Sequence, residues 1–341
     1  MIAPAPSVAT GGAAGSGNSN AVRRFAARVV DHALLDKWEP WSARRLRRWT
    51  PDADAAILIG HPFSPLVYAG KRLRAAGIPY VVDAGDPWVL TDPAPANRSV
   101  SLRRARRAEW ELWQGAAGAV LTTPQQADRL RDLFAGLPTL VRPNGYDPLP
   151  APLDQPRRAV GPELSIAHFG MLSTSRLDLR PLLRTLSDSG AWTRIVVAQF
   201  GDDFAGMLDG LPAGVEVERH PAYPWEQVVH QAAERDLAVV VGNVNPGQLP
   251  SKAVQYLTLP VPRLAVTEGS PADALAGYLR DKAGWLCVAP TDPAAASLIQ
   301  AHLARDWSEP DLKPPPEEAW PAVAESICAF VDRCVAREGG R

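Results

Sequence analysis

Short apolar runs alternate with amphipathic stretches along most of this chain, which predicts parallel β-strands connected by helices. In the first half, strands are expected at 55–59, 80–83, 116–121 and 139–142, and helices at 21–35, 38–49, 64–76, 98–113 and 124–134. In the second half, strands are expected at 165–169, 193–200, 215–219, 237–241, 263–267 and 285–288. The helices expected there cover 179–186, 224–235, 251–259, 270–279, 293–304 and 317–336. The pattern therefore predicts an α/β protein in which the alternation of strands and helices starts twice.

A proline-rich stretch without periodicity, 148–162, separates the two series of elements and is interpreted as a linker. The chain has 341 residues, which is more than one typical domain needs. We therefore expect two Rossmann-like, doubly wound domains, 1–150 and 151–341, that face each other across a cleft. The last amphipathic helix, 317–336, is expected to pack back toward the N-terminal domain.

Composition describes an ordinary soluble globular protein, with 46% hydrophobic and 21% charged residues. No apolar run reaches the roughly 18 residues that a membrane-spanning helix needs. The N-terminus also lacks the basic start and apolar block of a signal peptide. Cys287, Cys328 and Cys334 are too few and too scattered for a disulfide framework or a zinc site. These features favour a cytoplasmic protein.

The net charge of -1 hides an asymmetry between the two halves. Residues 1–150 hold 19 Lys+Arg and 13 Asp+Glu, a balance of +6, so the remaining 17 Lys+Arg and 24 Asp+Glu give -7. The helices at 38–49 and 98–113 carry most of the basic excess, with Arg103 and Arg107 in the second. The positive half could face an anionic acceptor or an anionic membrane surface, or it could simply be an uneven solvated surface.

The segment 237–267 predicts a buried strand, a loop of turn formers, a helix and a further strand. The helix is expected to start at Ser251, whose hydroxyl can cap free backbone N–H groups, and to stop before Pro260. Lys252 places a positive charge at the positive end of that helix, which is unfavourable unless an anion lies nearby. The segment therefore indicates either an anion site or an ordinary solvated lysine.

Two polar residues follow strands of the N-terminal half, at the edge where ligands bind parallel sheets. His61 comes after the strand at 55–59, whose apolar run predicts that it is buried, and Asp86 comes after the strand at 80–83. A histidine in this position can be structural or catalytic. A glycine-rich stretch around Gly12 precedes the helix at 21–35 and is a weak signal for ligand approach. Only 1–8 could supply a strand before it, which suggests a late start of the chain or a trimmed first half.

These motifs together resemble GT-B glycosyltransferases, and most closely the family-four-like retaining group. The segment 250–257, with Ser251, Lys252 and Gln255, is similar to that group's C-terminal proline-serine-lysine motif. In the N-terminal half, Gly60-His61-Pro62, the aspartate-rich turn 83–88 and the asparagine–glycine turn 143–147 resemble other family motifs. The resemblance covers most of 55–290. The order and spacing of the motifs are more specific than any single motif.

The resemblance implies a glycosyltransferase that moves a sugar from a nucleoside-diphosphate sugar to a glycan, lipid-linked or small-molecule acceptor, with retention. It places Lys252, Arg176, Gly170 and the N–H groups around Ser251 at the diphosphate, where they would stabilise the leaving group. Tyr223 would lie against the base, and Gln255 would hold the ribose. His61 and Asp86 would lie near the sugar or the acceptor hydroxyl as the catalytic candidates. No cofactor is implied, and polysaccharide biosynthesis is the expected context.

The chain departs from the family at two positions. The family often has two glutamates eight positions apart, which here fall on Gly247 and Gln255. These substitutions leave open a second hypothesis, a catalytically degenerate protein that binds a sugar nucleotide or a partner without turnover. A third is a GT-B relative with another activity, such as a sugar-nucleotide epimerase.

Two other classes of function are disfavoured. Asp202 and Asp203 follow a strand, but adjacent acids in that position are usually solvated turn residues, so no metal site is expected. Nucleic-acid binding would need aromatic residues among the basic ones and a strongly positive chain, and neither is found.

Overall fold

The computed structural model describes residues 35–36, 38–92, 100–148, 161–270, 272–307 and 312–339. Three sequence expectations lie outside these residues: the helix at 21–35 for all but its last residue, the glycine-rich stretch with Gly12, and the linker between 149 and 160. The boundary expected at residue 150 therefore stays a prediction.

The described part of the N-terminal half is built on a four-stranded parallel sheet of order β1-β2-β3-β4. Its strands are β1 Ala56–Ile59, β2 Tyr80–Ala84, β3 Gly118–Leu121 and β4 Thr139–Val141. Its helices are α2 Glu39–Leu46, α3 Phe63–Ala75, α4 Val100–Gln114 and α5 Pro124–Leu133. Helix α5 starts at a capping box. The Thr123 side chain accepts from the Gln126 backbone N–H, and the Gln126 side-chain oxygen accepts from the Thr123 backbone N–H.

The C-terminal half is built on a six-stranded parallel sheet of order β10-β9-β8-β5-β6-β7. Its strands are β5 Glu163–Phe169, β6 Arg194–Phe200, β7 Val215–His220, β8 Leu237–Val241, β9 Arg263–Val266 and β10 Trp285–Val288. Its helices are α6 Arg180–Asp188, α7 Trp225–Ala233, α8 Ser251–Gln255 with the 3₁₀ turn η1 Tyr256–Thr258, α9 Ala274–Leu279 and α10 Ala295–Leu303. The short turn η2 Pro316–Glu318 precedes the last helix, α12 Trp320–Gly339.

Two expectations about local structure are wrong. The strand at 55–59 was expected to be buried, but β1 is an edge strand, and its side chains alternate between half-buried and exposed, with Ile59 67% exposed. Ser251 was expected to cap helix α8, but the cap position is Pro250 and no side chain caps the helix. Ser251 is the first residue of helix α8, and its side chain is exposed. The N–H groups at the start of α8 therefore have no side-chain cap.

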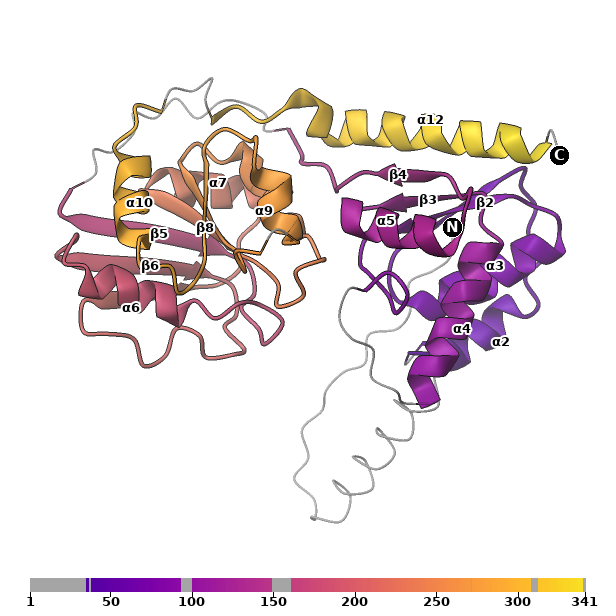
Figure 1. Ribbon diagram of the computed structural model, residues 1–341, viewed down its shortest axis with the longest axis horizontal. Coiled ribbons are helices and arrows are strands. Elements are labelled where there is room, and N and C mark those ends of the chain that lie inside the picture. The colour runs from indigo at the N-terminus through magenta and orange to yellow at the C-terminus, as the bar shows by residue number, and fades with distance from the viewer. Residues whose placement is uncertain are drawn as a thin grey trace, which may run out of the picture.

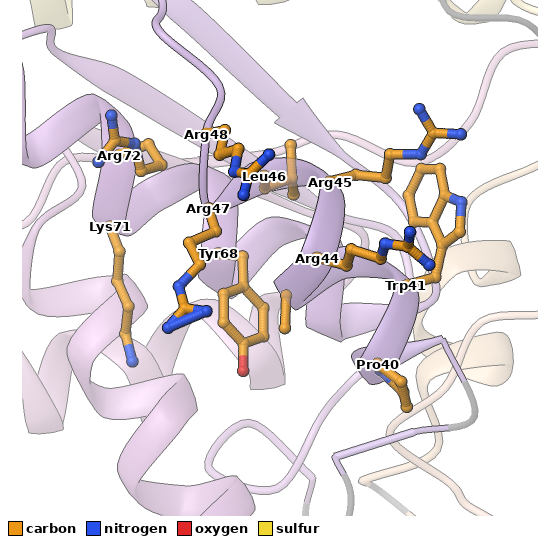
Figure 2. A pocket seen from close by; sticks show the side chains of 11 residues that line it. Pro40, Trp41, Arg44, Arg45, Leu46, Arg47, Arg48, Tyr68, Lys71 and Arg72 are labelled. Carbon is orange, nitrogen blue, oxygen red and sulfur yellow. The ribbon is translucent and has the colours of Figure 1, made fainter.

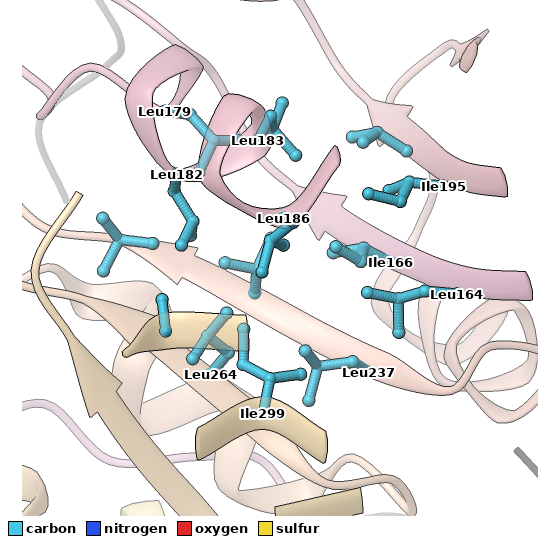
Figure 3. Packing of buried hydrophobic residues seen from close by; sticks show 14 of the residues in the cluster. Leu164, Ile166, Leu179, Leu182, Leu183, Leu186, Ile195, Leu237, Leu264 and Ile299 are labelled. Carbon is cyan, nitrogen blue, oxygen red and sulfur yellow. The ribbon is translucent and has the colours of Figure 1, made fainter. Parts of the chain in front are cut away.

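Helix α6 and the C-terminal sheet form the main core of that half, as Figure 3 shows. Leu182, Leu183 and Leu186 point from α6 onto Leu164 and Ile166 of β5. Strands β5, β6 and β8 are buried on both faces, as central parallel strands must be when helices cover the sheet on each side. This packing holds the ends of β5 and β8, and the loops that follow them, in fixed places.

The last helix leaves the C-terminal half and packs on the sheet of the N-terminal half (Figure 1). Phe330, Val331 and Cys334 of α12 form a buried cluster with Val81 of β2 and Val120 of β3. Just before the helix, Ala319 pairs with Tyr146 in an isolated parallel bridge. The chain therefore passes between the two halves a second time, next to the asparagine–glycine turn.

Candidate functional site

Gly170, directly after β5, lies beside Lys252. Its φ of +143° is unfavourable for residues with a side chain. A Cβ at this position would lie 3.9 Å from the Lys252 Cε and 3.9 Å from the His168 Cε1. The sheet thus brings together two residues that the sequence placed in one site, although they are far apart in the chain.

Lys252 is a half-buried cation that neutral groups hold in place. Its Nζ donates to the Gln255 Oε1 at 2.9 Å and lies 5.3 Å from the centre of the Trp225 indole. Burial lowers the pKa of Lys252 below its usual value, because the ammonium group loses hydration without gaining a carboxylate partner. The Gln255 side-chain oxygen, which was expected to hold a ribose, therefore accepts a hydrogen bond from Lys252 in this structure.

Arg176, in the loop between β5 and α6, is also a half-buried cation held by a neutral group. Its guanidinium donates to the Asn243 side-chain oxygen, and the backbones of the two residues form an isolated bridge. Burial lowers the pKa of Arg176, and the charge of Asp86 acts in the opposite direction. Among the residues that the structure describes, neither Arg176 nor Lys252 forms an ion pair with a carboxylate. Two partly desolvated positive charges are thus left for an anion to neutralise.

Behind Gly170 lies a buried polar pair that the sequence analysis missed. The His168 Nδ1 donates to the Gln199 Oε1 at 2.7 Å, and the Gln199 Nε2 donates to the carbonyl oxygens of Gly170 at 2.7 Å and Gly201 at 3.1 Å. These bonds fix the backbone of the loop that approaches Lys252. Burial lowers the pKa of His168 to about 4, so the ring is neutral at pH 7 and adds no charge to the site.

The low pKa of His168 predicts a pH-dependent stability. Between pH 6.5 and 4 the unfolded histidine binds a proton that the folded one does not, so the free energy of unfolding falls as pH falls. Between pH 7 and pH 5, we expect the free energy of unfolding to fall by about 2 kcal/mol more in the wild type than in His168→Gln. Urea unfolding at the two pH values measures this difference. An equal loss in both proteins would show that His168 does not titrate in this way.

The variant is needed as a reference because two carboxyl groups act in the opposite direction in the same pH range. Burial raises the pKa of Asp83 to about 6 and that of Glu109 to about 7. In this pH range the two carboxyl groups keep their protons in the folded protein and release them in the unfolded chain. Their contribution to the free energy of unfolding therefore falls as pH rises. Only the difference between wild type and His168→Gln isolates the histidine.

The aromatic residues of the predicted site lie around the same loops. The Tyr256 hydroxyl accepts from the Phe169 N–H at 2.7 Å and donates to the Phe169 carbonyl at 3.1 Å, so it fixes the end of β5. Tyr223 is half-buried, with its ring centre 5.7 Å from that of Phe200 at the end of β6. Tyr256 therefore supports the site, and Tyr223 stands at its edge.

The N-terminal half contacts this site through the loop after β8, which includes Gly247 and Gln248. The Gln248 Nε2 donates to the Asp86 Oδ1 at 2.6 Å, and the Thr123 hydroxyl donates to the Gly247 carbonyl at 3.3 Å. Asn245 donates to Asp92 at 2.9 Å. Asp86 thus lies at the junction of the two halves.

His61 is exposed after β1, and its ring meets Phe63 edge-on at 5.2 Å between centroids. No hydrogen bond joins it to Asp86 in the described part of the chain. Asp203, which the sequence analysis considered as half of an acidic pair, accepts from the N–H groups of Met207 at 3.0 Å and Leu208 at 2.9 Å. Its carboxylate therefore closes a turn.

Comparison with known proteins gives no match to any family model or curated protein sequence. Solved structures do match. One is an E. coli protein bound with UDP-2-fluoro glucose, with 14% identity over 91% of this chain and 75% of that chain and a TM-score of 0.53. A second is a GtfA/B complex, with 10% identity, 87% and 61% coverage and a TM-score of 0.59. A third is S. aureus TarM bound to UDP, with 13% identity, 79% and 59% coverage and a TM-score of 0.52.

The structural neighbours include GT-B glycosyltransferases of the retaining family-four group. This chain therefore has the GT-B fold, with two Rossmann-like α/β sheets, as the motifs predicted. At these identities the likeness establishes the fold and not the reaction. No helix in the described part of the chain is long and apolar enough to cross a membrane.

Proposed function

We propose that this protein transfers a sugar from a nucleoside-diphosphate sugar to a glycan, lipid-linked or small-molecule acceptor, with retention at the anomeric carbon. The observation that carries the proposal is a pair of half-buried cations, Arg176 and Lys252, whose side-chain partners in the described part of the chain are amide and aromatic groups. Lys252 lies beside Gly170, and the charges of both cations act on the neighbouring His168. Desolvated charges of this kind are costly unless an anion binds there. A diphosphate supplies that anion.

The chemistry of the site follows from where charge develops. When the bond between the sugar and the diphosphate breaks, negative charge grows on the leaving oxygen, and fixed cations at that point lower the barrier. Arg176 and Lys252 have this role in our proposal, and Gly170 lets the backbone approach the phosphates without a side chain in the way. Tyr223 would pack against the base, and the exposed Ser251 would present its hydroxyl and N–H near the phosphates.

Gln255 would hold the ribose after giving up its bond to Lys252. The Lys252 ammonium then turns from the Gln255 oxygen to the diphosphate, which is the stronger partner because it is charged. A glutamate at 255 would form an ion pair with the lysine and neutralise it. The amide thus leaves more of the positive charge for the donor.

On the acceptor side, we propose that Asp86 and His61 contact the acceptor hydroxyl or the transferred sugar. Asp86 is engaged by Gln248 across the junction, so an acceptor that uses this carboxylate must replace the amide. His61 is exposed and available to a ligand. We name no protein nucleophile for the retaining reaction.

A second candidate function is binding without turnover. The observation in its favour is the loop 243–248, where Gly247 replaces a family glutamate and serves as a contact for Thr123 of the other half. In this reading the protein holds a sugar nucleotide, and the loop connects the two halves. Both candidates require the same diphosphate site, so binding alone does not distinguish them.

Incubation with a panel of UDP-, GDP- and dTDP-sugars distinguishes the two functions. We expect release of the matching nucleoside diphosphate, with a sugar product of retained configuration by NMR. Tight binding of one nucleotide without release, across all acceptors tried, would support the binding function and exclude transfer. A changed sugar on an intact nucleotide would instead indicate an epimerase.

We also propose that the protein works in the cytoplasm, at the inner face of the membrane when its acceptor is lipid-linked. The exposed arginines of α4, such as Arg103 and Arg106, would contact anionic lipid there, at about 1 kcal/mol for each basic residue near the surface. Sedimentation with vesicles tests this. Binding that does not depend on anionic lipid would count against it.

A further inference from the structure

A second concave site lies in the N-terminal half, between α2 and α3 (Figure 2). Its volume is about 1210 Å³, and six cationic side chains line it: Arg44, Arg45, Arg47, Arg48, Lys71 and Arg72. We call this the basic pocket. All residues that line it lie between 40 and 72, whereas Arg176 and Lys252 of the candidate diphosphate site belong to the C-terminal half. The basic pocket is therefore built from other elements than the diphosphate site.

The charge of the basic pocket is largely unneutralised. In the described part of the chain its lining includes no acidic residue, and the four arginines at 44–48 are exposed and form no ion pair. Lys71 contacts Glu111 at 3.1 Å, and the Arg72 Nε donates to the Trp49 carbonyl at 2.9 Å. Arg44 and Arg45 lie in the last turn of α2, Arg47 is its C-cap residue and Arg48 follows, so four positive charges lie within five positions. A bound anion would reduce their mutual repulsion.

Aromatic side chains lie among these cations. Trp41, at one end of the basic pocket, is 39% exposed, and Figure 2 shows the Arg44 and Arg45 side chains extending toward that end. Tyr68 lies toward the other end, on the side of Arg47 and Lys71. A guanidinium pairs with phosphate, sulfate or carboxylate through two parallel hydrogen bonds, and an exposed indole offers a flat apolar face to a sugar ring.

Shape and charge distribution favour one class of ligand. A hollow of this volume is as large as sites that hold a discrete molecule, and its lining combines cations with Trp41 and Tyr68. The acidic second half, with a balance of -7 from 151 to 341, disfavours a nucleic acid, whose charge extends far beyond one pocket. A short charged chain with rings to stack fits both observations.

We propose that the basic pocket binds an acidic glycan, a carbohydrate chain that carries phosphate, sulfate or carboxylate groups. Its binding to the basic pocket depends only on the residues described above. Its role as the acceptor of sugar transfer, held here while its end reaches the junction of the two halves, rests on the proposed function. The reaction would then extend an acidic glycan, and the basic pocket would select for it.

Calorimetric titration of the full chain with a heparin octasaccharide, a sulfated oligosaccharide, tests the proposal. We expect Arg44→Ala/Arg48→Ala to bind it at least tenfold more weakly than wild type, with a weaker dependence on salt. Arg103→Ala/Arg106→Ala removes the same charge from exposed positions of α4 outside the basic pocket and should change the affinity less than twofold. Equal weakening in the two double variants would overturn the proposal, because it would indicate a diffuse basic surface.

Two further titrations distinguish a glycan from other anions. Trp41→Ala should weaken the binding of the octasaccharide severalfold. It should leave the binding of tripolyphosphate unchanged, because tripolyphosphate has no ring to stack on the indole. If Arg44→Ala/Arg48→Ala loses binding to phosphatidylglycerol vesicles but keeps its affinity for the octasaccharide, the basic pocket faces a membrane and the proposal is wrong.

UDP titrated into the same variants separates this proposal from the proposed function. Unchanged UDP binding together with lost octasaccharide binding supports two separate sites. If wild type binds no nucleotide but the octasaccharide results hold, the proposed function fails and the glycan site stands. If UDP binds and the basic-pocket variant retains full octasaccharide affinity, only the glycan site fails.

Discussion

Replacing Arg176 and Lys252 together by alanine should weaken the binding of UDP by about 100-fold or more, a loss of at least about 3 kcal/mol. Hydrogen bonds to charged groups contribute about 1.5 to 3 kcal/mol each, and both cations are held half-buried by neutral partners. The bound diphosphate would be their first charged partner in the C-terminal half. Calorimetric titration with UDP, with GDP and dTDP in parallel, measures the effect.

The matched control is Arg184→Ala/Arg280→Ala, which removes two exposed cations of the same half. It should change UDP affinity less than twofold. Far-UV circular dichroism and the free energy of unfolding show whether each variant is folded. A folded Arg176→Ala/Lys252→Ala protein that binds UDP as tightly as wild type would remove both residues from the diphosphate site and take away the basis of the proposed function.

Glu109→Ala should lower the free energy of unfolding by about 4 kcal/mol. Glu109 is completely buried, and its carboxylate accepts from the N–H groups of Val89 at 2.7 Å and Leu90 at 2.6 Å and from the Trp113 Nε1 at 3.2 Å. Alanine would leave the buried Trp113 donor and two half-buried backbone donors without this acceptor, at about 1 to 3 kcal/mol each, partly offset because the carboxylate is no longer desolvated. Urea unfolding monitored by tryptophan fluorescence gives the difference.

Glu111→Ala, two residues along the same helix, is the control. Its carboxylate lies near the surface, where it pairs with Lys71 at 3.1 Å and Arg107 at 3.0 Å, so its loss should cost less than about 1 kcal/mol. Glu109→Gln keeps an acceptor oxygen, so its free energy of unfolding should lie between those of Glu109→Ala and Glu111→Ala. If Glu109→Ala were no less stable than Glu111→Ala, the turn after β2 would not depend on the buried carboxylate.

The same change has a consequence for the candidate site. Val89 and Leu90 follow the segment that carries Asp86 and Trp88, and Trp88 stacks on Phe63 at 4.5 Å between ring centroids. In our proposal, Glu109 therefore helps to position the acceptor side of the site by holding the turn after β2. The sequence shows only a glutamate among arginines on α4, and the burial that gives it this role depends on tertiary packing.

The order of strands and helices could be predicted because each element is amphipathic or apolar over its whole length. One of the two local errors concerns how a strand is covered. Ala55–Ile59 has the apolar run of a buried strand, but its outer face stays partly exposed because the covering helix α12 packs on β2 and β3 and β1 is the edge strand. The sequence of a strand does not show which face a distant helix will reach.

The candidate site was partly predictable for a similar reason. Lys252, Arg176 and Gly170 stand out because charged and small residues follow apolar strands. The pair His168 and Gln199 did not stand out, although each is the second-last residue of its strand and the two are partners in the β5–β6 register. Two polar residues near the ends of consecutive buried strands are a signal that periodicity alone does not use. The basic pocket also needed the fold, because its cations come from the end of α2, the two residues after it and α3.

The path of the last helix affects the order in which the protein can be made. Phe330 and Val331 complete the covering of Val81 and Val120, yet they are translated some two hundred residues later. While the chain is being synthesised, this face of the first sheet lacks its covering until helix α12 leaves the ribosome, although N-terminal domains usually fold first. A truncation before Trp320 would thus damage the half of the protein that is synthesised first, far along the sequence from the cut.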